Sequence, residues 1–278
     1  MKLLLVLFCT ALLRAQDGKV VTTEVPKLDW LRTKTAAAKG RGLEVRRLDK
    51  VFPLVLSGTS LEGPSFVTSM TFFNITDEPA TLQIRLFDGQ GEPIALPIAT
   101  GPNTFDMHAE LLGDVPARAT VGFSTFRQNV RLRAVYATVA SEPAGAIQVM
   151  RTQTVALGSV TANTNDFAQT NENLGDILFV QPSPAPLDLY LLNASPEFMN
   201  VKVTARALNG TERCRTSHAV LSGQLLSLRL ADLSRCVASL TDPYVLDVVA
   251  DQPGLHAATL ELTRTSAYSH TMIPIPSN

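Results

Sequence analysis

The side chains that most often carry out catalysis or bind metals are scattered singly along this chain. Its four histidines have no partner at metal-ligand spacing, so each is expected on the surface or at a strand edge: His108, His218, His256 and His270. No serine lies in the Gly-x-Ser-x-Gly turn of a nucleophile elbow. The pattern argues against hydrolase and metal chemistry.

The acidic residues offer two weaker candidates. Residues 88–91 read Asp-Gly-Gln-Gly, but the further acidic positions of a calcium loop are missing, so turn formation explains Asp88 better. Asp106, Glu110 and Asp114 would suit the paired carboxylates of glycoside hydrolysis. They fall in a loop-like stretch, however, and any sequence offers two such residues. No catalytic residue, metal or cofactor is therefore predicted.

The cysteines favour a disulfide. Once a leader that contains Cys9 is removed, Cys214 and Cys236 remain as an even pair in an exported chain. Their bridge would close a loop of 22 residues and stabilise the fold by roughly 3 kcal/mol. Two buried free thiols are the alternative. A zinc site is disfavoured because its cysteines usually come in closely spaced pairs.

The leader is predicted at residues 1–15. Lys2 precedes an apolar run that ends at Leu13, which is the layout of a secretory signal and is shorter than the roughly 20 residues of a membrane helix. Cleavage is expected after Ala15, with Cys9-Thr10-Ala11 as a competing site and an uncleaved anchor or a lipoprotein as alternatives. The mature chain is thus expected to be secreted, periplasmic or at the cell surface, without a transmembrane segment.

Residues 16–48 are expected to form a basic arm or linker, with one short helix around residues 29–39. The arm either tethers the protein to an acidic surface or polysaccharide or is a solvated linker, and we favour the linker. Removal of the leader leaves 22 basic against 25 acidic residues, a net charge near −3. This balance gives no electrostatic reason to expect a nucleic-acid partner.

The sequence after the arm contains an internal repeat. Residues 70–76 return 119 positions later as residues 189–195, and Gly91 then matches Gly210. A second block, residues 135–145, returns at residues 244–254 with an offset of 109. The difference of ten between the offsets indicates a shorter middle section in the second copy. We therefore predict two homologous domains in tandem.

Alternating apolar residues predict strands in both copies. One face of each is apolar and is expected to point inward: Leu82, Ile84 and Leu86 in the first copy, and Val201, Val203 and Ala205 in the second. Strands at this spacing, with no long helical periodicity, predict an all-β fold of two antiparallel β-sandwiches of immunoglobulin-like type, with about seven strands each. The expected limits are 49–155 for domain 1, 156–176 for a linker and 177–278 for domain 2.

Three asparagines fit the glycosylation sequon: Asn74, Asn193 and Asn209. The first two lie at the repeated turn, where asparagine is expected to hydrogen-bond its own backbone, so coincidence explains the motif better. Sugar binding through an exposed aromatic platform is a separate alternative. Trp30, however, lies in the arm, and the tyrosines lie on predicted strands: Tyr136, Tyr190, Tyr244 and Tyr268.

The combination of an apolar strand ending in Asn-x-Ser/Thr, an alternating strand, a glycine turn and a later Glu-Pro-x-Gly or Gln-Pro-Gly turn resembles uncharacterised exported bacterial proteins built from tandem β-sandwich repeats. The resemblance covers residues 50–155 and 177–275 and implies an envelope or extracellular location. We expect a non-catalytic interaction or structural protein whose partner is a protein or an envelope polysaccharide. A carbohydrate-binding module and a hydrolase are the alternatives, and specificity is expected around residues 101–114.

Overall fold

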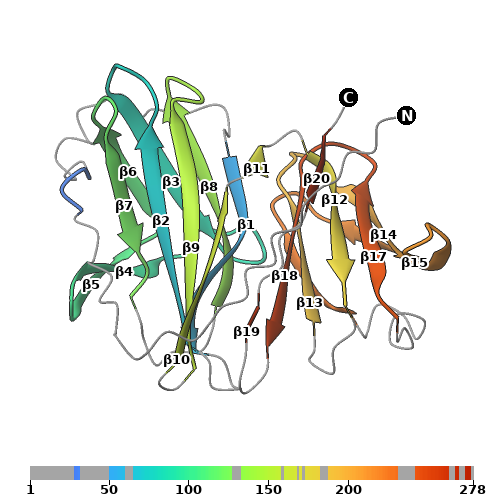
Figure 1. The fold of residues 1–278 in the computed structure, drawn as a ribbon. Coiled ribbons are helices and arrows are strands. Elements are labelled where there is room, and N and C mark those ends of the chain that lie inside the picture. The colour runs from blue at the N-terminus through green and yellow to red at the C-terminus, as the bar shows by residue number, and fades with distance from the viewer. Residues whose placement is uncertain are drawn as a thin grey trace, which may run out of the picture.

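The computed structural model describes residues 28–31, 50–59, 65–126, 133–157, 160–167, 169–170, 173–181, 187–230, 242–262, 267–268 and 273–276. Its elements are the strands β1 to β20, and every pairing between them is antiparallel. The all-β prediction is confirmed. The strands form two groups, which we call the first half (residues 50–170) and the second half (residues 173–276), and which lie side by side (Figure 1).

The first half contains two facing sheets. Sheet A has the order β6-β3-β8-β1-β11, with the bounds β6 (Glu110–Val115), β3 (Ala80–Phe87), β8 (Arg133–Glu142), β1 (Lys50–Thr59) and β11 (Gln169–Thr170). Sheet B has the order β7-β2-β9-β10, with the bounds β7 (Thr120–Ser124), β2 (Ser65–Asn74), β9 (Ile147–Leu157) and β10 (Val160–Phe167). The end of β1 also pairs with β2, so the two sheets join at one corner.

The second half repeats this arrangement. Sheet C has the order β15-β14-β17-β12-β20, with the bounds β15 (Glu212–Val220), β14 (Met199–Ala207), β17 (Tyr244–Ala250), β12 (Asn173–Val180) and β20 (Ile273–Pro276). Sheet D has the order β16-β13-β18-β19, with the bounds β16 (Leu225–Arg229), β13 (Leu187–Asn193), β18 (Leu255–Leu262) and β19 (Ala267–Tyr268). Strand for strand, sheet C has the order of sheet A and sheet D that of sheet B.

The strand register also matches between the halves. Ile84 lies opposite Val139 in sheet A, and Val203 lies opposite Val248 in sheet C. These are the pairs that the sequence offsets of 119 and 109 relate. The repeat in the sequence is thus also a repeat of backbone pairing.

One element of the first half has no counterpart among the described residues of the second. This is the hairpin of β4 (Leu96–Gly101) and β5 (Thr104–His108). Leu82 and its partner Gly113 are 31 positions apart, whereas Val201 and its partner His218 are 17 apart, so the first half is fourteen residues longer here. The prediction that residues 101–114 form a loop is wrong, because β5 and β6 occupy them.

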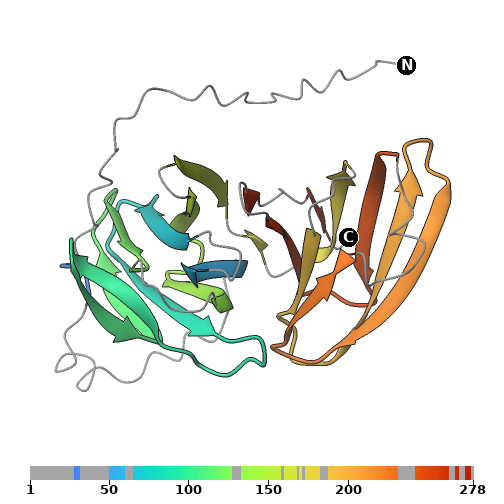
Figure 2. The same cartoon turned by 90° about the horizontal axis from the view of Figure 1, so that it is seen from below.

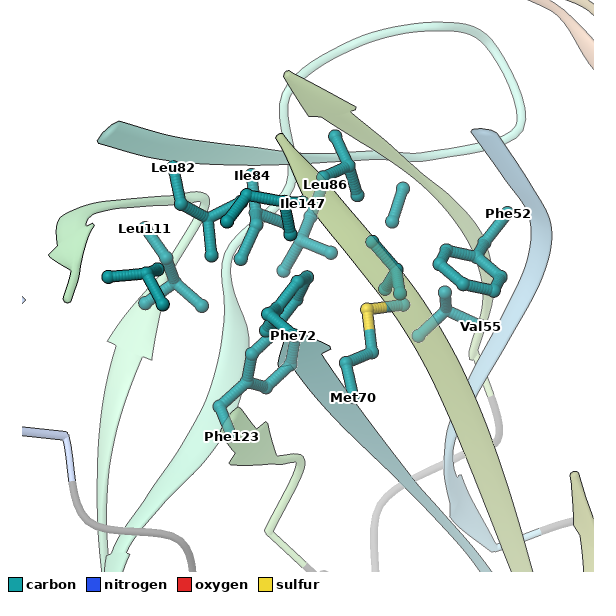
Figure 3. Packing of buried hydrophobic residues seen from close by; sticks show 14 of the residues in the cluster. Phe52, Val55, Met70, Phe72, Leu82, Ile84, Leu86, Leu111, Phe123 and Ile147 are labelled. Carbon is teal, nitrogen blue, oxygen red and sulfur yellow. The ribbon is translucent and has the colours of Figure 1, made fainter. Parts of the chain in front are cut away.

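Each half encloses an apolar core. In the first half, Leu82, Ile84 and Leu86 face inward as predicted, and Phe72 stacks on Phe123 with ring centroids 6.0 Å apart (Figure 3). In the second half, the inward-facing residues predicted on β14 are buried in the same way: Val201, Val203 and Ala205. Strands with one buried face explain this alternation.

A third apolar cluster lies between the halves, where β1 contacts β13 and β18 (Figure 1). Val51 and Tyr136 contribute from the outer face of sheet A, since their neighbours along β1 and β8 point into the first core. The second half contributes side chains from the outer face of sheet D: Tyr190, Leu192, Ala258 and Leu260. The halves therefore share buried apolar surface as well as a connecting chain.

The turn of residues 88–91 adds a backbone contact across this interface. The Leu225 amide donates to the Gly89 carbonyl at 3.0 Å. Gly91 has φ 85°, and a Cβ added to it would lie 2.9 Å from the Gly223 carbonyl oxygen. Gly210, its repeat equivalent, has the same φ of 85° but open space around it. Gly91 thus serves both the turn and the close approach of the second half.

The prediction of a linker at residues 156–176 is wrong. Residues 160–167 form β10, which pairs with β9 along its whole length, and β11 pairs with β1. The second half already begins at Asn173 in β12. A strand at the edge of a sheet tolerates polar residues, which is why the Asn- and Thr-rich composition of this stretch did not indicate a strand.

The basic arm also needs a correction at residues 28–31. Trp30 is buried, its indole Nε1 donates to the Gly122 carbonyl of β7 at 3.1 Å, and its carbonyl accepts from the Asp114 amide of β6 at 3.2 Å. Residues 29–30 form a turn rather than the start of a helix. Trp30 thus bridges the edge strands of sheets A and B, and the expectation of a solvated arm is wrong here. The leader and the remainder of the arm lie outside the described residues.

Candidate interaction surface

The three described histidines lie on different strands. His108 ends β5, and His218 on β15 lies 2.9 Å from the Thr216 hydroxyl, with its pKa lowered by burial. His270 lies outside the described residues. Across the described ranges, no three His, Cys, Asp or Glu side chains gather closely enough to hold a metal ion.

His256 is where the prediction of a surface or edge position is wrong. It is fully buried on β18, and burial lowers its pKa to about 4. Its strand partner is Leu192, a residue of the apolar cluster between the halves. His256 points away from the core of the second half, but the first half covers this face of sheet D. Its side chain is therefore buried from solvent.

Two of the three candidate carboxylates, Glu110 and Asp114, lie too far apart for an acid and base pair. Asp106 is exposed on β5, Glu110 bonds Gln83 and Arg85, and Asp114 accepts from the Thr81 hydroxyl at 3.0 Å. Glu110 and Asp114 are four residues apart on one strand, or roughly 13 Å at 3.3 Å per residue. This exceeds the roughly 5 to 9.5 Å between the carboxyl groups of glycosidases.

The asparagines of the repeated turn are structural. The Asn74 amide donates to the carbonyls of Glu78 and Val115 at 2.8 and 3.0 Å, while its Oδ1 accepts from the amide and hydroxyl of Thr76. Asn193 makes the same set of contacts with the equivalent residues: Glu197, Val220 and Ser195. Both asparagines are buried. Their amide nitrogens are engaged in the fold rather than available to a glycan.

The two buried polar residues of β12, Asn173 and Asp176, were not predicted from the sequence. The Ala257 amide donates to Asp176 Oδ2 at 2.7 Å, and the Asn173 amide donates to the Leu255 carbonyl at 2.9 Å, so both side chains connect sheet C to β18 of sheet D. Asp176 is fully buried, and this burial raises its pKa to about 6. The residue of sheet A that corresponds to Asp176 in the strand register is Lys50. Comparison of the two copies therefore did not indicate a buried acid.

The predicted cysteine pair is described at one end only. Cys214 is buried on β15 and belongs to the apolar core of the second half. Cys236 lies outside the described residues. The bridge between them stays a prediction.

The most distinctive exposed surface is the β4–β5 hairpin. Leu96 and Ile98 of β4 point into the first core, whereas Phe105 and Met107 of β5 are exposed. Phe105 also stacks on Phe126, with ring centroids 5.0 Å apart. The hairpin is thus anchored by one strand and presents apolar side chains to solvent on the other, within the stretch where specificity was expected.

No protein-family model matches this chain, and a search of curated proteins also finds no match. Within the part of the chain that the structure describes, no helix is long and apolar enough to cross a membrane.

Proposed function

We propose that the chain is an exported, non-catalytic interaction protein made of two homologous immunoglobulin-like sandwiches. The shared strand order, the shared register and the equivalent roles of Asn74 and Asn193 support duplication. The location outside the cytoplasm rests on the leader at residues 1–15 and on the cysteine pair.

The observation that carries an interaction role is the hairpin. Phe105 and Met107 expose apolar surface on an element that the second half lacks among its described residues. Exposed apolar side chains on an anchored element are typical of protein contacts. The carbohydrate alternative has less support, because Trp30 and the described tyrosines Tyr136, Tyr190 and Tyr244 are buried and offer no platform for a sugar.

The test compares residues 16–278 with a Phe105→Ser/Met107→Ser variant. Both proteins are immobilised and exposed to the envelope fraction of the source cells and to a glycan array. We expect a partner that the parent captures and the variant loses, because serine removes the apolar surface without touching the core. Equal capture by both proteins would place the binding surface elsewhere. Turnover by the parent in a panel of hydrolase substrates would contradict the non-catalytic role.

A further inference from the structure

Within the described ranges, the contact between the two halves uses only one copy of each contacting face. Inside the chain, the outer face of sheet A packs on the outer face of sheet D. By strand order, sheet C is the equivalent of sheet A, and sheet B is the equivalent of sheet D. The chain therefore presents a second face of each kind, on the outer sides of sheets B and C.

The free face of sheet B carries apolar residues at interface positions. Leu192 and Ala194 lie at the contact between the halves, and the repeat aligns them with Phe73 and Ile75. Phe73 is 37% exposed and Ile75 is 46% exposed. These are large apolar side chains in water at positions whose equivalents pack against the other half.

The free face of sheet C is apolar at the complementary positions. Val51 and Tyr136 of the contact correspond to Ile177 and Val245, as the strand register shows. Phe179 lies beside Val245 on the same face and is 53% exposed. Isolated exposed apolar residues are common on protein surfaces, but here four apolar side chains, two on each face, lie at positions that the internal contact uses.

We propose that a second copy of this chain occupies these faces, with sheet C of one molecule packing on sheet B of the next. The contact would repeat the one between the halves, and it rests on the duplication proposed above. Because the two contacting faces differ, the contact is heterologous and does not close on itself in a pair, so further copies can add at both ends. The assembly uses neither Phe105 nor Met107, so it is separate from capture of another partner by the hairpin.

Sedimentation of residues 16–278 over a wide concentration range tests the proposal. We expect the mean mass to rise through dimer and trimer as the concentration increases. Phe179→Asp on sheet C and Ile75→Asp, directly after β2 of sheet B, should each weaken association at least tenfold, since an unpaired carboxylate would be buried in the contact. Phe198→Asp is the matched control, because Phe198 is exposed before β14 and its repeat equivalent, Pro79, is exposed and takes no part in the contact between the halves.

Mixing the two variants distinguishes this contact from a symmetric one. Each variant keeps one intact face, so an equimolar mixture should form a heterodimer and stop there, while each variant alone should associate at least tenfold more weakly than the parent. A symmetric dimer through sheet C would leave Ile75→Asp fully dimeric and would overturn the proposal. So would a parent that stays monomeric at every concentration, or a control that dissociates like the two face variants. Equal melting temperatures of parent and variants, measured at a concentration where the parent is monomeric, exclude unfolding as the cause.

Discussion

Two buried ionisable residues of the second half have opposite effects on stability as the pH changes. His256 has a pKa lowered to about 4, so its contribution is present above pH 6.5 and is lost as the pH falls through 4. Asp176 has a pKa raised to about 6, so its contribution is present below pH 3.8 and is lost as the pH rises through 6. Between about pH 4 and 6.5, the two residues therefore change the free energy of unfolding in opposite directions.

We therefore expect each single variant to reveal the slope of the other residue. With His256→Gln, the free energy of unfolding should fall by roughly 3 kcal/mol as the pH rises from 4 to 6.5, and with Asp176→Asn it should rise by a similar amount. The double variant, which lacks both residues, gives the pH dependence that comes from all other ionisable groups. Urea unfolding at several pH values measures the slopes, and single variants that follow the double variant would contradict the assignment.

At the scale of the element, Trp30 should hold the edge strands β6 and β7 together. Trp30→Ala removes a buried ring, 6.2 Å from Phe72 between centroids, and the hydrogen bond to Gly122. Such a truncation typically costs about 3 to 5 kcal/mol. Trp30→Phe keeps a ring without the indole N–H, so it should cost less.

Urea unfolding followed by circular dichroism measures both Trp30 variants. Trp30 is also the one tryptophan of the chain, so its emission in the parent should be that of a buried indole and should shift to the red on unfolding. An unshifted, solvent-like emission in the folded parent would contradict the bridging role.

The cysteines provide a second prediction for a single element. A bridge from Cys214 to Cys236 should appear in mass spectrometry of non-reduced peptides from protein that was exported by its own leader. Cys214→Ser should then lower the free energy of unfolding by about 2 to 4 kcal/mol. Reduction of the parent should lower it equally, whereas reduction of the variant should have no effect. Recovery of both peptides unlinked would refute the bridge.

At the scale of the whole molecule, the apolar cluster between the halves should make them unfold together. Leu192→Asp places a carboxylate at a fully buried position in that cluster. Burial of an unpaired charge is strongly unfavourable, so the halves should separate and calorimetry should show two transitions in place of one. Leu221→Asp, at an exposed position, should keep the single transition. Two transitions in the parent would show that the halves are not coupled.

The periodicity of the chain was enough to predict the core strands and their inner faces. Leu82, Ile84 and Leu86 could be placed inside because successive side chains of a strand alternate between its faces. The asparagine and glycine turns were also readable, because these residues satisfy backbone geometry locally. The hairpin could be located but was taken for a loop, although the alternation of Phe105 and Met107 with polar residues on β5 is the signal that could have predicted a strand.

What covers the outer face of each sheet was decided only by the tertiary structure. Gln148 and His256 hold the same position in the two halves, opposite Phe73 and Leu192, yet Gln148 is exposed and His256 is fully buried. The alternation of side chains along a strand predicts that both Gln148 and His256 point away from the core of their own half. It contains no information about a neighbouring sheet, because that contact joins residues far apart in the sequence. The burial of His256 and of Trp30 therefore follows from packing rather than from local pattern.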